Sequence, residues 1–453
     1  MPGDSSLIQP LAAYADKTTI RALLEALDRE CSGYCLLAGY EELPVTVCSD
    51  IDFMVSQQDF ERLPQILSSF AREVGFRLVR NIEHETTACS YALAQSQPGQ
   101  ALFLHPDSCS DYRRANRTWL RPEVVLARRR MHPNGFWIPA AADGFLYYLI
   151  KRIEKLSLEE RHTQQLSRLF SEDRLGCTEA LTQRLTTTSA QLVVEAARSG
   201  DWQPVIGAIH ELREELLARA SVDSLRTKLG ELRRKIRRVV QPTGLCVAVL
   251  GPDGSGKSSV IEQYLQAVAQ VCTGTACFHL RPYLLRGLSE GQTDSTDPHG
   301  QIPRGALMST AKLLFLWADY VLGYYLRVRP LLVRTTLVVF DRYYQDLLID
   351  ARRFRYGGPQ WLAHLVAALI PMPDLMLVLD APAHVLQARK QEVSAEESAR
   401  QAEAYRAVAN SPALRGHAVL VDAARPLEQV VYQCADRTLA LLAMRTAKRL
   451  HLD

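Results

Sequence analysis

One segment constrains the fold of this 453-residue chain more than any other, and it reads LCVAVLGPDGSGKSSVIEQYL over residues 245–265. Its first six residues form a continuously apolar run, which is typical of a strand buried within a parallel sheet. Gly251, Gly256, Lys257 and Ser258 then fit the spacing GxxxxGK[ST], and a helical pattern follows. A strand, a glycine-rich loop and a helix in this order predict a parallel α/β domain that binds phosphate.

The residue types in this loop explain how it would bind a nucleotide. Glycines let backbone N–H groups turn inward on the phosphates, and the N-terminus of the following helix adds a positive potential. Lys257 is expected to reach the β- and γ-phosphates, and the Ser258 hydroxyl is expected to hold Mg²⁺. ATP and Mg²⁺ are therefore the predicted cofactors. The residues predicted to bind ATP are Gly251, Asp253, Gly254, Ser255, Gly256, Lys257, Ser258 and Ser259.

A second apolar run, in TTLVVFDRYYQDLLID at 335–350, ends at Asp341 and Arg342. A carboxylate at the end of a buried parallel strand lies beside the phosphate loop in this architecture. Asp341 is predicted to orient the Mg²⁺ shell or the acceptor hydroxyl, and Arg342 to clamp the transferring phosphate. The alternative is that Asp341 only caps the next helix.

A third apolar run starts at Pro373, ends near Asp380, and is followed by Arg389 one short helix later. The polar helical stretch QEVSAEESARQAEAYRAV comes next, at 391–408, where a mobile lid with a charge-stabilising arginine would lie. An ordinary surface helix has the same pattern, so both interpretations stay open. The predicted catalytic residues are Lys257, Asp341, Arg342 and Arg389.

Three regions separate along the chain. Residues 1–138 alternate short helical and strand patterns, residues 139–241 are helical throughout, and Pro242 and Gly244 end that stretch. Residues 242–453 alternate strands with helices, which predicts a parallel sheet with crossover helices. The predicted fold class is α/β: a phosphate-loop domain with a parallel sheet at 242–453, an α+β domain at 1–138 and a helical connector at 139–241.

The segments GPDGSGKSS, DRYYQDL and PDLMLVLDAPAHVLQAR, in this order and spacing, resemble the thymidylate kinase family over about residues 245–445. That family transfers the γ-phosphate of ATP to the phosphate of dTMP. The resemblance implies that Asp253 contacts an acceptor hydroxyl, that Arg342 bridges the phosphates and that Arg389 acts from the lid.

Two departures from the family concern the acceptor. The family's Arg-Glu-Pro-Gly run corresponds here to FHLRPYLLRG at 278–287, which keeps Arg281 but loses the acid and the glycine. The family's base-reading arginine corresponds to Tyr320, which cannot supply the same fork of donors. The acceptor is therefore predicted to be anionic or polyhydroxylated. The residues predicted to bind it are Asp253, Arg281, Arg286, Arg304, Tyr320 and Arg342.

The first region carries a pair of carboxylates in CLLAGYEELPVTVCSDIDFMV, at 35–55. Asp50 and Asp52 are two residues apart on a predicted strand, so both project from one face and can bind Mg²⁺. The segment resembles the nucleotidyltransferase superfamily but has Tyr40 where a serine or glycine is usual. The third carboxylate of that superfamily corresponds to Asp107, although His105 occupies the more strand-like position. A solvated acidic edge on an inactive domain is the alternative.

Composition limits the partners. Lys plus Arg total 53 against 50 Asp plus Glu, so the charge balance gives no strong nucleic-acid signal, and RRKIRRVV at 233–240 is interpreted as a solvated helix face. No stretch offers about 20 clean apolar residues, so no transmembrane segment is predicted. The ten cysteines form no CxxC pair, which favours reduced thiols and a cytoplasmic location. A homodimer is possible.

Together these features predict an ATP-dependent kinase whose acceptor is a small anionic molecule, a sugar or a glycan. The layout resembles that of bacterial thymidylate-kinase-like proteins associated with surface-polysaccharide synthesis. Three alternatives remain: a genuine thymidylate kinase with an altered base pocket, an ATP-binding regulatory protein, and a nucleotidyltransferase whose second domain only senses ATP.

Overall fold

The computed structural model describes residues 11–41, 43–44, 50–114, 117–219, 225–284, 304–389 and 394–452. The chain is mixed α/β, as predicted, and one of its sheets is parallel with five strands. It divides into two compact units. The C-terminal unit comprises Arg237–Leu442 with Gln95–Leu102 and the chain up to Ala13, and the N-terminal unit comprises Tyr14–Ala94, Phe103–Ile236 and Ala443–Asp453.

The parallel sheet of the C-terminal unit has the order β13-β14-β12-β15-β16. Alternate residues of β12 face opposite sides: Cys246, Ala248 and Leu250 pack in one core cluster with residues of α12 and α15. On the helices of the unit, a hydrogen bond of 2.8 Å joins Tyr264 of α11 to Thr438 of α18. The elements are β12 (Leu245–Leu250), α11 (Lys257–Val268), η1 (Ala269–Val271), β13 (Gly274–His279), α12 (Ala306–Gly323), η3 (Tyr324–Val328), α13 (Arg329–Val333), β14 (Thr336–Asp341), α14 (Gln345–Ile349), α15 (Gln360–Leu369), β15 (Leu375–Asp380), α16 (Ala383–Arg389), α17 (Ala395–Ala409), η4 (Pro412–Leu414), β16 (Ala418–Asp422) and α18 (Leu427–Leu450).

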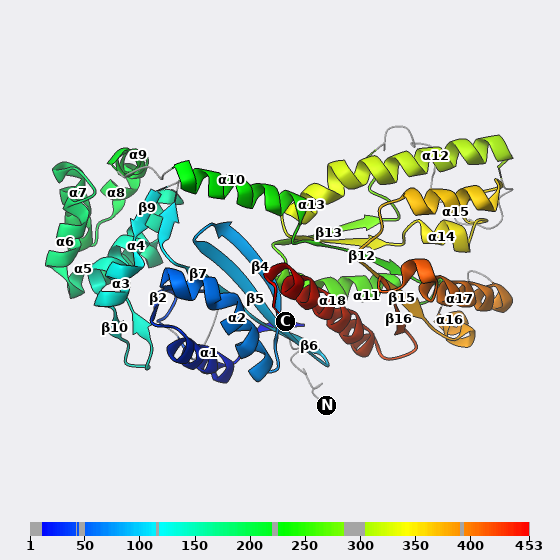
Figure 1. Ribbon diagram of the computed structural model, residues 1–453, viewed down its shortest axis with the longest axis horizontal. Helices are drawn as coiled ribbons and strands as arrows, with labels where there is room; N and C mark the ends of the chain where they lie inside the picture. Colours follow the sequence, from blue (N-terminus) through cyan, green and yellow to red (C-terminus); the bar gives the residue numbers. More distant parts are fainter. Residues whose placement is uncertain are drawn as a thin grey trace, which may run out of the picture. The chain divides into compact units, whose positions relative to one another are not determined.

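The three central strands of this sheet are buried nearly end to end, whereas the edge strands β13 and β16 are largely exposed or half-buried. Every residue of β12 is buried, and so are the first five residues of β14 and of β15. Figure 1 shows α12, α14 and α15 together along one side of these strands. The stretch Ala306–Val333 is the one helix among the described residues long and apolar enough to cross a membrane, and a third of it is buried inside the protein.

A mixed sheet has the order β1-β6-β5-β7-β3-β2, with β4 paired to β5, and its strands β2, β3, β4 and β7 belong wholly to the N-terminal unit. The helical part of this unit follows the sheet in sequence and packs with it into a common core. The elements are β1 (Ala12–Tyr14), α1 (Lys17–Glu30), β2 (Tyr34–Ala38), β3 (Ile51–Val55), α2 (Gln57–Glu73), β4 (Arg77–Glu85), β5 (Ala88–Gln97), β6 (Gln100–Leu104), β7 (Pro106–Cys109), β8 (Tyr112–Arg114), β9 (Arg117–Leu120), α3 (Pro122–Arg128), β10 (Arg130–Met131), β11 (Trp137–Ile138), α4 (Ala141–Glu154), α5 (Glu160–Glu172), α6 (Arg174–Thr182), α7 (Thr187–Ser199), α8 (Gln203–Gly207), α9 (Ile209–Arg219) and α10 (Leu225–Val240).

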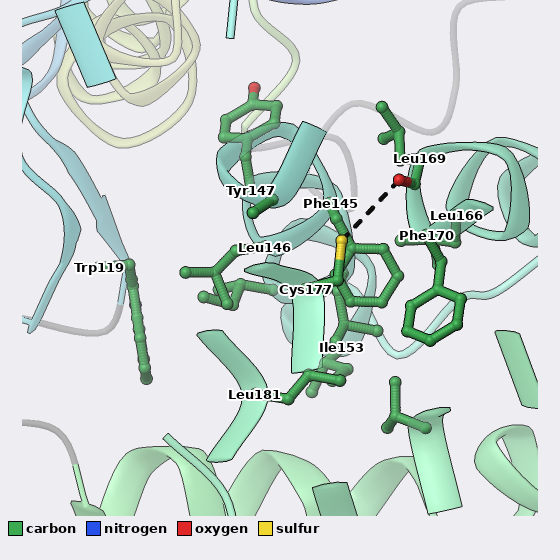
Figure 2. Close-up of a cluster of buried hydrophobic side chains, with 14 of the residues drawn as sticks. Trp119, Phe145, Leu146, Tyr147, Ile153, Leu166, Leu169, Phe170, Cys177 and Leu181 are labelled. Carbon is green, nitrogen blue, oxygen red and sulfur yellow. Dashed lines mark hydrogen bonds between the residues drawn. The ribbon is translucent and has the colours of Figure 1, made fainter. Parts of the chain in front are cut away.

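That core explains why the predicted connector is not a separate compact unit. Phe145 of α4, Leu169 of α5 and Cys177 of α6 pack together, with the Cys177 thiol 3.8 Å from the Leu169 carbonyl oxygen (Figure 2). The same cluster includes Cys35 of β2 and Trp119 of β9. The helices from α4 to α9 therefore complete the core of the N-terminal sheet, and the boundary between the units falls inside α10, at Ile236 and Arg237.

Candidate functional site

The glycine-rich loop leaves the carboxyl end of the central strand of the parallel sheet. β13 and β14 lie on one side of β12, and β15 and β16 lie on the other, so the order of the strands reverses at β12. Parallel α/β folds bind their ligands at such a reversal, outside the carboxyl ends of the strands. The predicted phosphate loop therefore lies where this kind of sheet normally binds a ligand.

Two glycines are required by the backbone of the loop. Gly251 has φ +151°, and a Cβ there would lie 2.8 Å from the Leu379 carbonyl oxygen. Gly256 precedes α11 with φ +84°, in the left-handed region that favours glycine. Ser258 and Ser259 follow in the first turn of α11 with exposed side chains. The loop thus combines close backbone approach with two hydroxyl groups at a helix N-terminus, which suits an anion.

The Lys257 side chain folds back over this loop. Its ammonium donates hydrogen bonds to the carbonyl oxygens of Gly251 and Pro252, each at 2.8 Å, and the residue is only 8% exposed. Burial, together with the nearby Arg342 guanidinium, lowers the pKa of Lys257 to about 7. An adjacent phosphate would favour the charged form of this amine, because opposite charges at close range stabilise each other.

Asp253 joins two arginines at the mouth of the loop. Its Oδ1 accepts from Arg342, and its Oδ2 accepts from Arg353 at 2.6 Å. Arg342 also donates to Asp346 at 2.5 Å. Burial raises the pKa of Asp253, but Arg342, Arg353 and Lys257 outweigh that effect and lower it to about 2. Arg342, Arg353 and Lys257 thus balance the carboxylates of Asp253 and Asp346, and Asp341 also lies near Lys257.

Asp341 lies beside the loop because β14 pairs with β12. The register places Asp341 opposite Val249, and its Oδ2 is 3.3 Å from His279 Nδ1. Burial opposes ionisation, but His279 holds the pKa of Asp341 below its usual value. Asp341 Oδ1 and Ser255 Oγ are buried and have no hydrogen-bond partner among the described residues. Because buried polar atoms normally have partners, these two atoms suit a bound ligand, and Asp341 with Ser258 could hold Mg²⁺.

The predicted acceptor residues do not all reach one place. Arg281 is buried, pairs with Asp319 at 3.3 Å and lies over the rings of Tyr283 and Phe315. Tyr320 is part of the core: it is 2% exposed, and its hydroxyl donates to the Leu280 carbonyl oxygen. The structure thus gives Tyr320 a packing role against neighbouring tyrosines. Arg286 lies outside the described residues.

Basic residues that the sequence analysis missed gather near Arg304. The Lys312 ammonium donates to the Phe354 carbonyl oxygen at 3.0 Å, and the Arg304 N–H donates to the Arg355 carbonyl oxygen at 3.1 Å. Burial, with the charges of Arg304, Arg355 and Arg281, lowers the pKa of Lys312 to about 8. The run ARRFRY at 351–356 is the sequence signal that could have found this group and Arg353.

The predicted lid arginine lies at the end of α16. Arg389 is exposed, and its guanidinium donates to the Ala423 carbonyl oxygen at 2.8 Å. The helix that follows, α17, reaches the loop site through another residue: the Tyr405 hydroxyl is buried 3.5 Å from Arg342. The described part of the predicted lid therefore contributes Tyr405 to the arginine network, whereas Arg389 contacts the chain after β16.

The N-terminal unit brings together Asp52 of β3, Asp107 of β7 and Asp50, which directly precedes β3. β3 pairs in parallel with β7, and the register places Asp52 opposite Asp107. Asp50 precedes Asp52 by two residues, so the carboxylates share one side of the sheet. His105, the competing candidate, lies between β6 and β7 and is buried. Strand pairing thus brings Asp107, rather than His105, opposite Asp52.

A lysine balances part of this negative charge. Lys151 of α4 donates to Asp52 Oδ2 at 2.7 Å and to the Tyr147 hydroxyl at 2.9 Å. Burial and the charges of Asp52 and Asp50 raise the pKa of Asp107 to about 7. Burial and Asp52 also raise the pKa of Asp50. In the described part of the chain, no three His, Cys, Asp or Glu side chains lie close enough to form a ready metal site.

Comparison of the sequence with known proteins identifies no relative. No protein-family model matches the chain, and no curated protein matches it significantly.

Proposed function

We propose that the C-terminal unit is an ATP-dependent kinase, which transfers the γ-phosphate of Mg–ATP to a small anionic or glycan-borne acceptor. One observation carries the proposal: the basic side chains of Lys257, Arg342 and Arg353 lie together beside a glycine loop at the reversal of a parallel sheet. The unpartnered Asp341 Oδ1 and Ser255 Oγ support it. The resemblance to thymidylate kinases over residues 245–445 favours the same reaction type.

The roles of the residues follow from phosphoryl-transfer chemistry, which depends on positioning and on neutralising charge. The backbone N–H groups of the loop and Lys257 would hold the β- and γ-phosphates. Arg342 would bridge the donor and acceptor phosphates, kept in place by Asp346. Ser258 and Asp341 would hold Mg²⁺, which neutralises the charge that develops on the phosphate oxygens. Asp253, whose low pKa keeps it ionised, would accept a hydrogen bond from an acceptor hydroxyl.

The acceptor is proposed from the basic residues around Lys312, Arg304 and Arg355, which suit a negatively charged group. A thymine base is disfavoured because Tyr320, which replaces the base-reading arginine, is buried in the core. A site built to hydrogen-bond a substrate group rejects an analogue that lacks this group by about 10⁴–10⁵-fold, and we expect a loss of similar size when the enzyme's own donor is absent. The resemblance to polysaccharide-associated proteins supports a glycan acceptor.

An acceptor screen tests this proposal. The purified chain is incubated with radiolabelled Mg–ATP and with nucleoside monophosphates, sugars, sugar phosphates or cell-envelope glycans, and labelled product is measured. We expect acceptor-dependent label transfer, little turnover of dTMP, and none with Lys257→Met. Efficient turnover of dTMP would favour a genuine thymidylate kinase. ADP release at the same rate with every acceptor, without labelled product, would favour the regulatory alternative.

A second candidate function, nucleotidyl transfer by the N-terminal unit, is favoured by the register of Asp52 and Asp107. Two or three such carboxylates could hold Mg²⁺ and a nucleoside triphosphate. Two observations weigh against this activity. Asp52 is already paired with Lys151, and Tyr40 stands where the superfamily usually has a serine or glycine. Label from α-labelled triphosphate in a product, lost in Asp107→Asn but retained in Lys257→Met, would support this activity.

A further inference from the structure

Helix α10 (Leu225–Val240) is amphipathic, but its apolar face is exposed and its polar face contacts the rest of the protein, the reverse of an ordinary surface helix. Its apolar stripe faces outward: Leu229, Leu232, Ile236, Val239 and Val240 are each 53–67% exposed. These positions recur every three or four residues, so they lie along one side of the helix. Such a stripe normally faces the core of a protein, and its exposure here indicates that a partner covers it.

The polar side of α10 is the side that contacts the protein. In the N-terminal unit, Glu231 accepts a hydrogen bond from the Thr86 N–H at 2.6 Å, and Arg234 donates to the Glu83 carbonyl oxygen at 2.7 Å. In the C-terminal unit, Arg238 donates to the Val333 carbonyl oxygen at 3.0 Å. Hydrogen bonds on the inward side therefore fix the rotation of the helix that leaves the apolar stripe outside.

Exposed cations flank the stripe on both sides. At 3.6 residues per turn, Arg233 and Arg237 lie along one edge of the stripe, and Lys228 and Lys235 lie along the other. The one acid in the helix, Glu231, is on the inward side, where Arg234 pairs with it at 2.8 Å. The outward surface of α10 is therefore aliphatic in its middle and basic along both edges.

From this arrangement we propose that α10 docks the protein on the surface of an anionic lipid bilayer, with its aliphatic stripe among the acyl chains. A flat bilayer contacts the stripe and both basic edges at the same time, as in interfacial amphipathic helices. Anionic headgroups attract each lysine or arginine near the surface. The inference concerns location and does not depend on the proposed kinase reaction.

Two other occupants explain the surface less well. A second copy of α10 would bring two basic edges together, which like charges disfavour. A nucleic acid would neutralise the cations but leave the aliphatic stripe uncovered. The stripe also contains none of the aromatic residues that dominate protein–protein contacts. Charge and apolar character together therefore favour lipid.

The test uses the full chain and two kinds of vesicle, one of pure phosphatidylcholine and one that also contains phosphatidylglycerol. The anionic vesicles contain about 30 mol% phosphatidylglycerol, which gives a surface charge on the order of that of a cell membrane. The vesicle-bound fraction is measured by co-sedimentation. We expect binding to the anionic vesicles that weakens at high salt, and little binding to the neutral ones. The double variant Arg233→Gln with Lys235→Gln removes two cations from α10. Each cation contributes about fivefold to binding, so the variant should bind the anionic vesicles about 30-fold more weakly than the parent.

A second variant pair separates lipid from the other occupants. Leu232→Gln with Ile236→Gln removes apolar side chains that are already exposed, so the fold should stay intact, and vesicle binding should fall at least about tenfold. Leu175→Gln with Arg198→Gln, at exposed positions on α6 and α7, is the matched control and should bind like the parent.

Three results would overturn the proposal. The first is no binding of the parent chain to anionic vesicles. The second is vesicle binding that neither α10 pair changes. The third is a dimer in sedimentation equilibrium that the Leu232→Gln and Ile236→Gln pair dissociates, because a second copy would then cover the stripe. Duplex DNA binding that only the cation pair weakens, with no vesicle binding, would assign the surface to nucleic acid instead.

Discussion

Two half-buried aspartates, one in each unit, have opposite charge environments. Asp253 in the C-terminal unit contacts Arg342 and Arg353, and its pKa falls to about 2. Asp107 in the N-terminal unit faces Asp52 and Asp50, and its pKa rises to about 7. Both are partly removed from water, so the difference comes from the neighbouring charges. The Asp253 carboxylate is therefore balanced by neighbouring cations, whereas the Asp107 carboxylate lies among other carboxylates.

Removal of the loop lysine should give the largest effect. Lys257→Met should lower phosphoryl transfer at least about 10²–10³-fold, as expected for the loss of one preorganised charge at the transferring phosphate. The melting temperature should be unchanged or higher, because the buried amine no longer has to be desolvated. The exposed Lys448→Met is the matched control and should retain activity. Turnover by Lys257→Met near the parent value would show that the glycine loop takes no part in phosphoryl transfer.

Arg342→Met should lower the free energy of unfolding of the C-terminal unit. It would leave the almost completely buried Asp346 without its arginine partner, while Asp253 would keep its bond to Arg353. The loss of a partner from a buried charge costs about 3–5 kcal/mol of unfolding free energy. Urea denaturation measures the change. Arg353→Met, whose side chain is 27% exposed, should cost less because Asp253 keeps its bond to Arg342. Equal losses of unfolding free energy in the two variants would show that the bonds of Arg342 stabilise the protein no more than the bond of Arg353.

The two aspartates should also respond oppositely to pH. The pKa of Asp107 rises from 3.8 to about 7 on folding, so its contribution to stability is full below pH 4 and is lost as pH rises toward 7. The pKa of Asp253 falls from 3.8 to about 2, so its contribution is present above pH 4 and is lost as pH falls toward 2.

Melting curves of Asp107→Asn and Asp253→Asn, compared with the parent between about pH 2 and pH 8, measure both contributions. Relative to the parent, Asp107→Asn should gain stability as pH rises from 4 to 7, and Asp253→Asn should lose it as pH rises from 2 to 4. Mg²⁺ at pH 8 should raise the melting temperature of the parent more than that of Asp107→Asn, if the N-terminal unit binds a cation. Parallel curves for the parent and Asp107→Asn would contradict the assigned environment of Asp107.

The smallest expected effect distinguishes the two neighbouring strand carboxylates. Asp50→Asn should raise the unfolding free energy by up to about 1 kcal/mol, because it relieves repulsion from Asp52. Asp52→Asn should lower it, because Lys151 loses its ionic partner. Isothermal urea titrations of the two variants suffice, and shifts of the same sign would argue against the Lys151 contact.

Local sequence predicted the loop well because its information is contiguous. The apolar run, the glycine spacing and the following helix coincide with β12, the loop and α11 (Lys257–Val268). The partner of the loop residue Asp253 comes from distant sequence, because Arg353 is 100 residues away. In the N-terminal unit, Lys151 is likewise 99 residues from Asp52. Only the packing of strands and helices brings such pairs together, so spacing alone could not predict them.

Tyr320 and the helical connector show a second limit of sequence reasoning. Tyr320 was expected at the acceptor, but it shares the buried side of α12 with Leu313 and Leu316, so the helix turns it into the core. Residues 139–241 read as a connector because they are uniformly helical, and the apolar sides of α4, α5 and α6 instead complete the core below the N-terminal sheet (Figure 2). Helical periodicity predicts which side is apolar but not what that side covers.

Equilibrium binding of ATP tests the assignment of the glycine loop as the nucleotide site, because it needs no knowledge of the acceptor. Titration calorimetry of the parent chain with ATP and Mg²⁺ should give one site per chain, weakened at least about tenfold in Lys257→Met, whose lost charge no longer meets the phosphates. The double variant Asp50→Asn with Asp52→Asn, confined to the other unit, should leave that affinity unchanged. Binding that persists in Lys257→Met but disappears in the aspartate variant would place the nucleotide in the N-terminal unit and contradict the account.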